Sequence, residues 1–473
     1  MAKTNSKYTS AMQLLACVLI GVVLWFLPHP AALSLAGWHM FALFLATIVA
    51  LVLNPMPIGA IAILSLTVLL LTNLVPLKTA LNGFGDKTIW LIVIAFFISR
   101  GFIKSGLGKR IAYLFVRLFG KKTLTLSYAL LACDVILAPA TPSNTARAGG
   151  ILYPITRSLA ESFGSNPGDH TEKKIGSFLI YTLFQGNLIT SAMFLTAMAG
   201  NPVAVSLASS LGVHISWMGW FAAALVPGLV SLVLIPFLIY KIYPPEIKET
   251  PDAPKLAQEK LKEMGPISKS EKRMLFCFAV VLLLWVLGSQ INLDATVGGF
   301  IGLSVMLLLD VINWEDVKSE KGAWNSLVWF SVLIMEATQL NTLGFIPWFS
   351  KSVAGMVQGL AWPMVLVILA LLYFYSHYMF ASATAHVSAL YSAFLGVAIA
   401  AGVPAVPAAL ALGFLSNLMG STTHYGMGTA PILFGSGYVT QNKWWSLNFL
   451  FSIVYLIIWV GGGFAYWHLI GLF

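Results

Sequence analysis

The stretch that decides the fold is TPSNTAR at residues 141–147, which returns in altered form as FASATAH at residues 380–386. Both stretches are rich in small and polar residues, and each interrupts a long apolar region. Ser143 and Ser382 are 239 positions apart, as are the last residues of the two stretches. Polar backbone at membrane depth is tolerated only where it is buried in protein or lines a water-filled cavity. A matched pair of such breaks in two halves of a chain therefore predicts the binding site of a transporter.

The composition is that of an integral membrane protein. The chain has 473 residues, of which 58% are hydrophobic and 9% charged, whereas a soluble domain has about 25% charged residues. The net charge of +10 could suggest a nucleic-acid partner. Basic residues, however, gather in the cytoplasmic loops of membrane proteins, so we expect the lipid bilayer as partner and no nucleic acid. The three cysteines show no metal-ligand spacing, and we expect no disulfide framework, metal or cofactor.

Hydropathy predicts eleven membrane-spanning helices and two re-entrant hairpins. A span needs about 20 mostly apolar residues. Two further apolar stretches, 124–160 and 361–401, are long enough to enter the membrane and return, and each has one of the motifs near its middle. We expect each to be a helical hairpin with the motif at its tip. The expected spans are 11–28, 38–56, 58–76, 88–106, 175–196, 216–241, 274–292, 295–312, 324–344, 405–419 and 447–470.

The placement of Lys and Arg predicts the orientation and the domains. Residues 100–122 contain seven basic residues and no acidic one, which indicates a cytoplasmic loop and a cytoplasmic N-terminus. Five spans in each half give the halves opposite topology, with the first hairpin open to the cytoplasm and the second to the outside. We expect a protein of the plasma membrane of a bacterium. Its expected parts are a leading helix at 1–35, a first inverted repeat at 36–242, a charged cytoplasmic linker at 243–272 and a second repeat at 273–473.

The chemistry of the two tips suits carboxylates. Hydroxyl and amide side chains and free backbone N–H groups are hydrogen-bond donors, and helices that begin at the tips point their positive dipole ends into the cavity. Two facing tips suit a molecule with a carboxylate at each end. The alternative is that small residues only let helices pack closely; the repeat spacing favours a site. The candidate residues at the tips are Ser143, Asn144, Thr145, Ser382, Ala383 and Thr384, and those at two further breaks are Gly200, Asn201, Pro202, Gly428 and Thr429.

These residues resemble a known family. The Ser143-Asn144-Thr145 motif, its degenerate copy Ser382-Ala383-Thr384 and the stretch Gly435-Ser436-Gly437 are similar to those of the divalent anion:sodium symporter family. The resemblance is strongest to its exchanger branch, which includes the plastid 2-oxoglutarate/malate translocator and the bacterial citrate/succinate and tartrate/succinate antiporters. It implies a homodimer that works by an elevator motion. It also implies that the tip motifs hold the substrate carboxylates, and that backbone carbonyls beside them hold sodium in the coupled members.

The chain departs from the sodium-coupled pattern at Ala383, where the family usually has Asn, and at Arg147 and His386, where small neutral residues are expected. We expect Arg147 and a protonated His386 to act as fixed positive charges in place of two sodium ions. An intramembrane Arg is costly and usually functional. An unperturbed His has a pKa of about 6.5, so a bound dianion can favour its charged form. Moving an empty carrier with two unpaired charges would cost roughly 5–7 kcal/mol, a slowing on the order of ten-thousand-fold. This predicts obligatory, sodium-independent exchange of C4–C5 dicarboxylates such as malate, succinate, fumarate and 2-oxoglutarate.

Three other functions are compatible with parts of the sequence. A sodium-coupled dicarboxylate or citrate symporter would share the fold. A proton antiporter or a permease of the arsenite efflux type would need paired buried acids, and Asp134 and Glu336, the only candidates near the hairpins, do not follow the repeat spacing. A membrane-embedded enzyme would need a cluster of catalytic groups, yet the eight histidines are scattered and no glycine-rich phosphate loop is present. We therefore expect no enzymatic activity.

Overall fold

The secondary structure of the described residues is helical, and turns and loops join the helices. The computed structural model describes residues 2–357 and 359–473, and within them the only β-type pairing is an isolated bridge between Lys122 and Glu249. Seven helices in this part of the chain are long and apolar enough to cross a membrane, and four shorter helices are apolar as well. The predicted fold class, an all-α membrane protein, is confirmed.

The helices of the first half and the linker are α1 (Ala2–Phe26), α2 (Leu35–Leu53), α3 (Ile58–Leu71), α4 (Leu77–Ala80), α5 (Lys87–Ser105), α6 (Leu107–Phe119), α7 (Thr123–Leu137), α8 (Tyr153–Ser162), α9 (Gly176–Met193), α10 (Gly200–Ser210), α11 (Trp217–Ile242) and α12 (Ala253–Glu263). Those of the second half are α13 (Lys269–Leu287), α14 (Ala295–Leu308), α15 (Trp314–Ser319), α16 (Lys321–Thr342), α17 (Phe345–Met356), α18 (Trp362–Tyr375), α19 (Ala383–Ala400), α20 (Ala405–Leu418), α21 (Thr429–Phe434), α22 (Gln441–Tyr455) and α23 (Gly463–Leu469). Short 3-10 or π segments are η1 (Asn82–Gly85), η2 (Ala138–Ala140), η3 (Thr145–Leu152), η4 (Leu195–Ala197), η5 (Ser376–Met379), η6 (Met419–Ser421) and η7 (Leu456–Gly462).

Each of the eleven expected spans contains a helix, and each expected hairpin consists of two helices joined at its motif. In the first hairpin α7 and η2 lead to the tip, and η3 and α8 lead away from it. In the second, α18 and η5 lead to the tip and α19 leads away. The sequence reasoning missed α6 and α17, which follow α5 and α16 directly. Each of them begins after a glycine with a positive φ, Gly106 or Gly344, where the chain can change direction at little cost.

Side-chain caps explain where several helices begin. Asp86 accepts hydrogen bonds from two backbone N–H groups at the start of α5, and Asp294 accepts one, from the N–H of Thr296, at the start of α14. Ser216 caps α11, and Ser268 forms a reciprocal capping box with Glu271 at the start of α13. Such caps satisfy N–H groups that have no partner within the helix.

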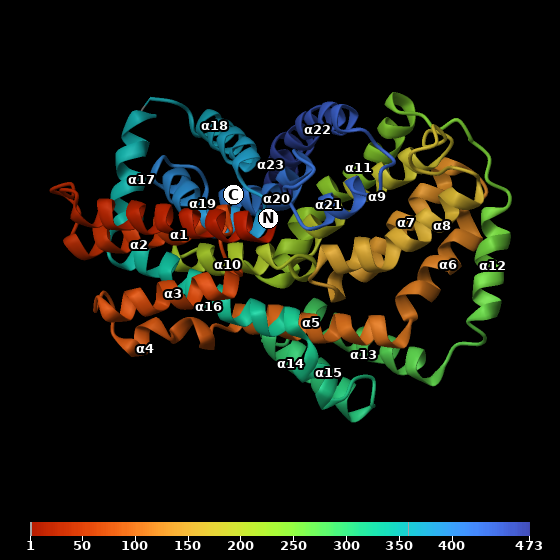
Figure 1. Ribbon diagram of the computed structural model, residues 1–473, viewed down its shortest axis with the longest axis horizontal. Coiled ribbons are helices and arrows are strands. Elements are labelled where there is room, and N and C mark those ends of the chain that lie inside the picture. The colour runs from red at the N-terminus through yellow and green to blue at the C-terminus, as the bar shows by residue number, and fades with distance from the viewer. Residues whose placement is uncertain (1, 358) are drawn as a thin grey trace.

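The helices form two groups that meet at the tips of the hairpins. In Figure 1, α5, α13, α14, α15 and α16 lie on one side, and α18 to α23 with α9 and α11 lie on the other. The helices α6 and α12 stand at one end of the molecule and α17 stands at the other. The helices α10 and α19 contact each other, and α10 also contacts α5 and α16. The broken helices and the hairpins therefore meet the α5–α16 pair in the middle of the molecule.

Candidate binding site between the two hairpin tips

The two tips share two hydrogen bonds, although the segment that leaves the first tip is a π-helix (η3) and the one that leaves the second is an α-helix (α19). Ser143 Oγ accepts a hydrogen bond from the N–H of Ala146 at 3.1 Å, and Ser382 Oγ accepts one from the N–H of Ala385 at 3.3 Å. The carbonyls of these serines also have equivalent partners. The N–H of Arg147 donates to the carbonyl of Ser143 at 3.0 Å, and the N–H of His386 donates to the carbonyl of Ser382 at 3.1 Å. Both serines thus start a helix, and the copies recognised in the sequence are copies in structure.

A cavity of about 210 Å³ lies between the tips. The structure brings together here seven of the residues that the sequence singled out: Ser143, Asn144, Thr145, Ser382, Ala383, Thr384 and Gly428. Pro142 of the first tip motif and Met427 of the second break, next to Gly428, line it as well. The sequence reasoning missed the rest of the lining, which comes from α5, α16 and the residues just before α10: Phe96, Met198, Ala199, Ser326, Trp329 and Phe330. No residue of this lining is ionisable.

Of the two further breaks, the one expected at Gly200, Asn201 and Pro202 lies slightly earlier in the chain than expected. Met198 and Ala199 line the cavity, whereas Gly200, Asn201 and Pro202 do not, because they already belong to α10. Asn201 is buried and serves the packing of the breaks: its Nδ2 donates to the carbonyls of Ser191 and Phe194, and its Oδ1 accepts from Asn417 at 2.6 Å. Thr429 is fully buried at the start of α21 and also stays outside the cavity lining.

Four helices begin at the cavity. The residues directly before η3, α10, α19 and α21 are Asn144, Ala199, Ser382 and Gly428, and all four line the cavity. The N-terminus of a helix carries a partial positive charge, so this arrangement favours an anion. Gly428 is needed for the close approach of its break to the first tip, since a Cβ there would stand 2.3 Å from Thr145 Oγ1.

Arg147 is fully buried behind the first tip and is paired with an acid. Its Nε donates to Asp134 Oδ1 at 2.6 Å, and both side chains are 0% exposed. Asp134 also accepts hydrogen bonds from Asn187 and Thr190. The expectation that Arg147 stands as an unpaired charge is therefore wrong. Sequence reasoning set Asp134 aside because it has no acidic partner in the second repeat, where the equivalent position, 239 residues later, is Tyr373. The partner of Asp134 is instead Arg147 of its own hairpin.

The remaining hydrogen bonds of Arg147 go to the backbone around the tip. Its Nη1 donates to the carbonyl of Thr141 at 2.8 Å and to the carbonyl of Ala197 at 3.0 Å. Its Nη2 contacts the hydroxyls of Thr190 and Ser191 at 3.3 and 2.8 Å. The guanidinium thus joins the segment before the tip to the first break, and it does not line the cavity.

His386 is buried behind the second tip and also lies outside the cavity lining. Its Nε2 lies 3.0 Å from Ser376 Oγ, and because that hydroxyl donates to the carbonyl of Tyr373, it must accept from the imidazole. The Nδ1 atom lies 2.8 Å from the sulfur of Met419, and the ring stacks on Tyr373 with centroids 4.7 Å apart. A neutral imidazole therefore carries its hydrogen on Nε2, and its bare Nδ1 faces the Met419 sulfur, which can only accept a hydrogen bond. The role of a protonated His386 as a fixed positive charge remains a prediction.

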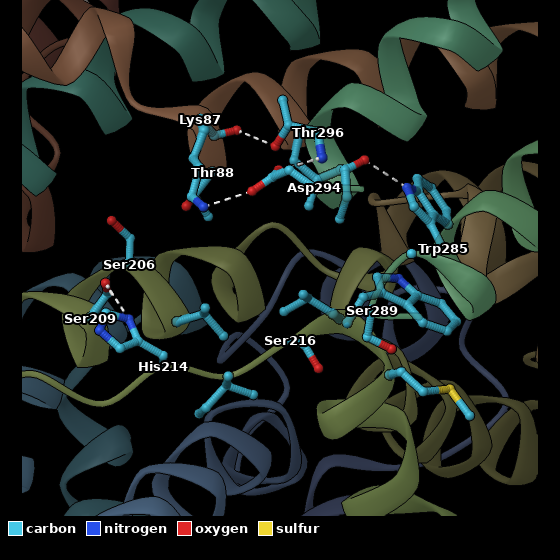
Figure 2. A pocket seen from close by; sticks show the side chains of 18 of the residues that line it. Lys87, Thr88, Ser206, Ser209, His214, Ser216, Trp285, Ser289, Asp294 and Thr296 are labelled. Atoms are coloured by element: carbon cyan, nitrogen blue, oxygen red, sulfur yellow. Dashed lines mark hydrogen bonds and ion pairs between the residues drawn. The ribbon is translucent and has the colours of Figure 1, made fainter. Parts of the chain in front are cut away.

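A second and larger cavity, of about 650 Å³, lies between the starts of α5 and α14 on one side and α10 and α11 on the other. Figure 2 shows Lys87, Asp294 and Thr296 on one wall and Ser209, His214 and others on the opposite wall. The helix starts here are already capped by Asp86 and Asp294, and Lys87 is ion-paired with Asp294 at 2.6 Å. Two carboxylates against one ammonium group disfavour a dianion, so we assign the site to the smaller cavity between the tips.

Comparison with known proteins agrees with this geometry. The family model of the sodium:sulfate symporter transmembrane region matches residues 8–473. YflS of Bacillus subtilis, whose name describes it as a candidate malate transporter, is 58% identical over 460 residues, which are 97% of this chain and 96% of that protein. Dicarboxylate transporter 1 of the Spinacia oleracea chloroplast is 50% identical over 466 residues, 98% of this chain and 82% of that protein.

A bacterial antiporter and a solved structure complete the comparison. The L-tartrate/succinate antiporter of Escherichia coli is 37% identical over 466 residues, 94% of this chain and 95% of that protein. The crystal structure of the Alcanivorax borkumensis YdaH transporter has the same fold, with a TM-score of 0.60 at 15% identity over 84% of this chain and 88% of that one. The chain therefore belongs to the divalent anion:sodium symporter family, in the branch that contains these dicarboxylate transporters and the tartrate/succinate antiporter.

Proposed function

We propose that this protein exchanges C4–C5 dicarboxylates across the membrane by sodium-independent antiport. The observation that carries the proposal is the convergence of four helix N-termini on a cavity whose lining holds no ionisable side chain. A helix N-terminus is worth about half a positive charge, so η3, α10 and α19 come to roughly one and a half, and the six-residue α21 adds little. This matches a dianion with one carboxylate at each tip.

The contacts of Arg147 support independence from sodium. Its guanidinium donates to the carbonyl oxygens of Thr141, just before the first tip, and Ala197, in η4 before the first break. Backbone carbonyls are good ligands for a small cation, and here a tethered cation already uses them. Asp134 fixes this guanidinium in place. The first tip therefore needs no mobile ion to be held in a substrate-binding arrangement.

The reason for obligatory exchange changes accordingly. Because Asp134 neutralises Arg147, the penalty of roughly 5–7 kcal/mol for two unpaired charges does not apply to this pair. The helix ends at the cavity supply the fixed positive potential instead. They cannot leave with the substrate, so an empty cavity keeps the partial positive charge of the helix ends, which a bound anion offsets. Return of the unloaded carrier is then slow compared with exchange.

The lining of the cavity is also compatible with an elevator motion. One wall consists of Phe96 on α5 with three residues of α16, and the other walls are the hairpin tips and the breaks. In the proposed cycle the hairpins and breaks carry the substrate past the α5–α16 wall. We further propose two inverted repeats at 36–242 and 273–473, a homodimer, a cytoplasmic N-terminus and a place in the plasma membrane of a bacterium.

A counter-transport assay tests the function. The purified protein is reconstituted into vesicles with or without internal succinate, and uptake of labelled succinate is measured in sodium or choline buffer. We expect equal initial rates in the two buffers, and at least tenfold slower uptake into vesicles without internal dicarboxylate. A strict sodium requirement would favour the sodium-coupled dicarboxylate or citrate symporter. Absence of dicarboxylate uptake in every condition would refute transport of this substrate class.

A further inference from the structure

One buried histidine has no part in the site as described so far. His377 lies in η5, just before the second tip, and is 0% exposed. Its Nε2 lies 2.8 Å from the carbonyl oxygen of Gly426. A carbonyl can only accept, so Nε2 carries the hydrogen. Among the described residues the Nδ1 atom of His377 has no hydrogen-bond partner, so the one hydrogen bond of this ring goes to the second break.

The contact between His377 and Gly426 is close and specific. A Cβ on Gly426 would stand 2.8 Å from the Nε2 atom of His377, so a side chain there would push the ring or the break away. The two residues after Gly426 are Met427 and Gly428, and both line the cavity between the tips. The position of the Gly426 carbonyl therefore sets where this part of the cavity wall lies.

The first half contains the same kind of contact. There Arg147 Nη1 donates to the carbonyl of Ala197 at 3.0 Å. Ala197 lies three residues before the start of α10, and Gly426 lies three residues before the start of α21. Each break thus has the equivalent carbonyl held by a nitrogen donor of the neighbouring hairpin. In the second half the donor is His377 and not His386, whose Nε2 contacts Ser376.

We infer that His377 is a positioning residue for the dicarboxylate site, because its Nε2–H group holds the Gly426 carbonyl and thereby the cavity wall formed by Met427 and Gly428. The inference rests on the proposed function for the identity of the ligand. His377 is absent from the cavity lining and acts through Gly426. Loss of the donor leaves a buried carbonyl unpaired, which is unfavourable, and the break shifts to find another partner.

Two substitutions of His377 separate the hydrogen bond from packing. His377→Leu removes the donor, and His377→Gln keeps an amide N–H near the Nε2 position. We expect His377→Leu to raise the KM for succinate at least tenfold while the maximal exchange rate stays within threefold of the wild-type rate. We expect His377→Gln to keep the KM within threefold. His468→Leu, at an exposed histidine near the C-terminus, is the control. A wild-type KM in His377→Leu overturns the inference.

Further measurements separate the positioning role of His377 from a folding defect and from failure of the exchange proposal. Each variant is first compared with the wild type for monodispersity in detergent and for thermal unfolding. If His377→Leu does not fold, Gly426→Ala decides, because its Cβ displaces the same contact: a raised KM supports the inference and an unchanged KM overturns it. The rise in unfolding temperature when succinate is added compares succinate binding by the wild type and the variants without a transport assay. If the wild type binds succinate but does not exchange it, the exchange proposal fails while the binding series still tests His377.

Discussion

Replacing Arg147 with glutamine is expected to lower succinate exchange at least a hundredfold. The substitution leaves the Asp134 carboxylate buried without its cation, which costs about 3–5 kcal/mol for a buried pair. It also removes the donors that hold the carbonyl of Thr141 before the first tip and the carbonyl of Ala197 before the first break. An uncompensated anion behind the tip then opposes the binding of a dianion in front of it. The measurement is labelled-succinate exchange in vesicles, normalised to the amount of folded protein.

Companion variants distinguish the charge of Arg147 from its hydrogen bonds. The double variant Asp134→Asn with Arg147→Gln removes both charges, so we expect it to fold better than Arg147→Gln but to remain at least tenfold slower than the wild type. Arg147→Lys keeps the charge without the planar fork of donors and should give an intermediate rate. Arg157→Gln is the matched control, since Arg157 is 49% exposed and pairs with Glu161 on the same helix. Exchange by Arg147→Gln within threefold of the wild type would remove Arg147 from the proposed mechanism.

The parts of the fold that follow from local composition could be predicted from the sequence. Spans are long apolar runs, and the tips interrupt such runs with small polar residues, so both are visible without knowledge of packing. The helix α6 was missed because Lys109, Arg110 and Arg117 make it amphipathic and not uniformly apolar. The break before α10 was placed too late, because Gly-Asn-Pro marks the start of the helix and the residues that line the cavity are the two before it.

The charge balance of the site could not be predicted in the same way. Asp134 and Arg147 are 13 positions apart on the two arms of one hairpin, and only the bend at the tip brings them together. A search for repeat-related acids passes over Asp134, because the second half has Tyr373 there. His377 did offer a signal, since it stands 239 positions after Ala138. A titratable residue in one repeat opposite alanine in the other marks a position at which the two halves differ in chemistry.

The common element in both halves is a donor that fixes the backbone before a broken helix. Arg147 does this for Ala197 and His377 for Gly426, while the cavity itself is lined by neutral groups. Recognition of the substrate is thus assigned to backbone N–H groups and hydroxyls, and the buried cation is used for architecture. Because such a site recognises carboxylate ends, the length of the carbon chain between them is limited by the distance between the tips.

Substitution of Gly428 by valine should reduce exchange at least tenfold without loss of the fold. A Cβ at this position would stand 2.3 Å from Thr145 Oγ1, so the second break and the first tip must separate. The two methyl groups of valine also enter a cavity of only about 210 Å³. The change adds apolar volume where a carboxylate is expected and moves two of the four helix starts apart. The rate of succinate exchange and the stabilisation by succinate are both measured.

Gly150→Ala is the matched control for this prediction. Gly150 lies in η3, a few residues beyond the same tip, but it is exposed and a Cβ there meets no atom within 4 Å. We expect it to exchange succinate within twofold of the wild type. Thermal unfolding without ligand should be similar for both variants, since Gly428 borders a cavity whose walls can shift outward. If Gly428→Val keeps both its exchange rate and its response to succinate, the cavity between the tips is not the place where the dicarboxylate binds.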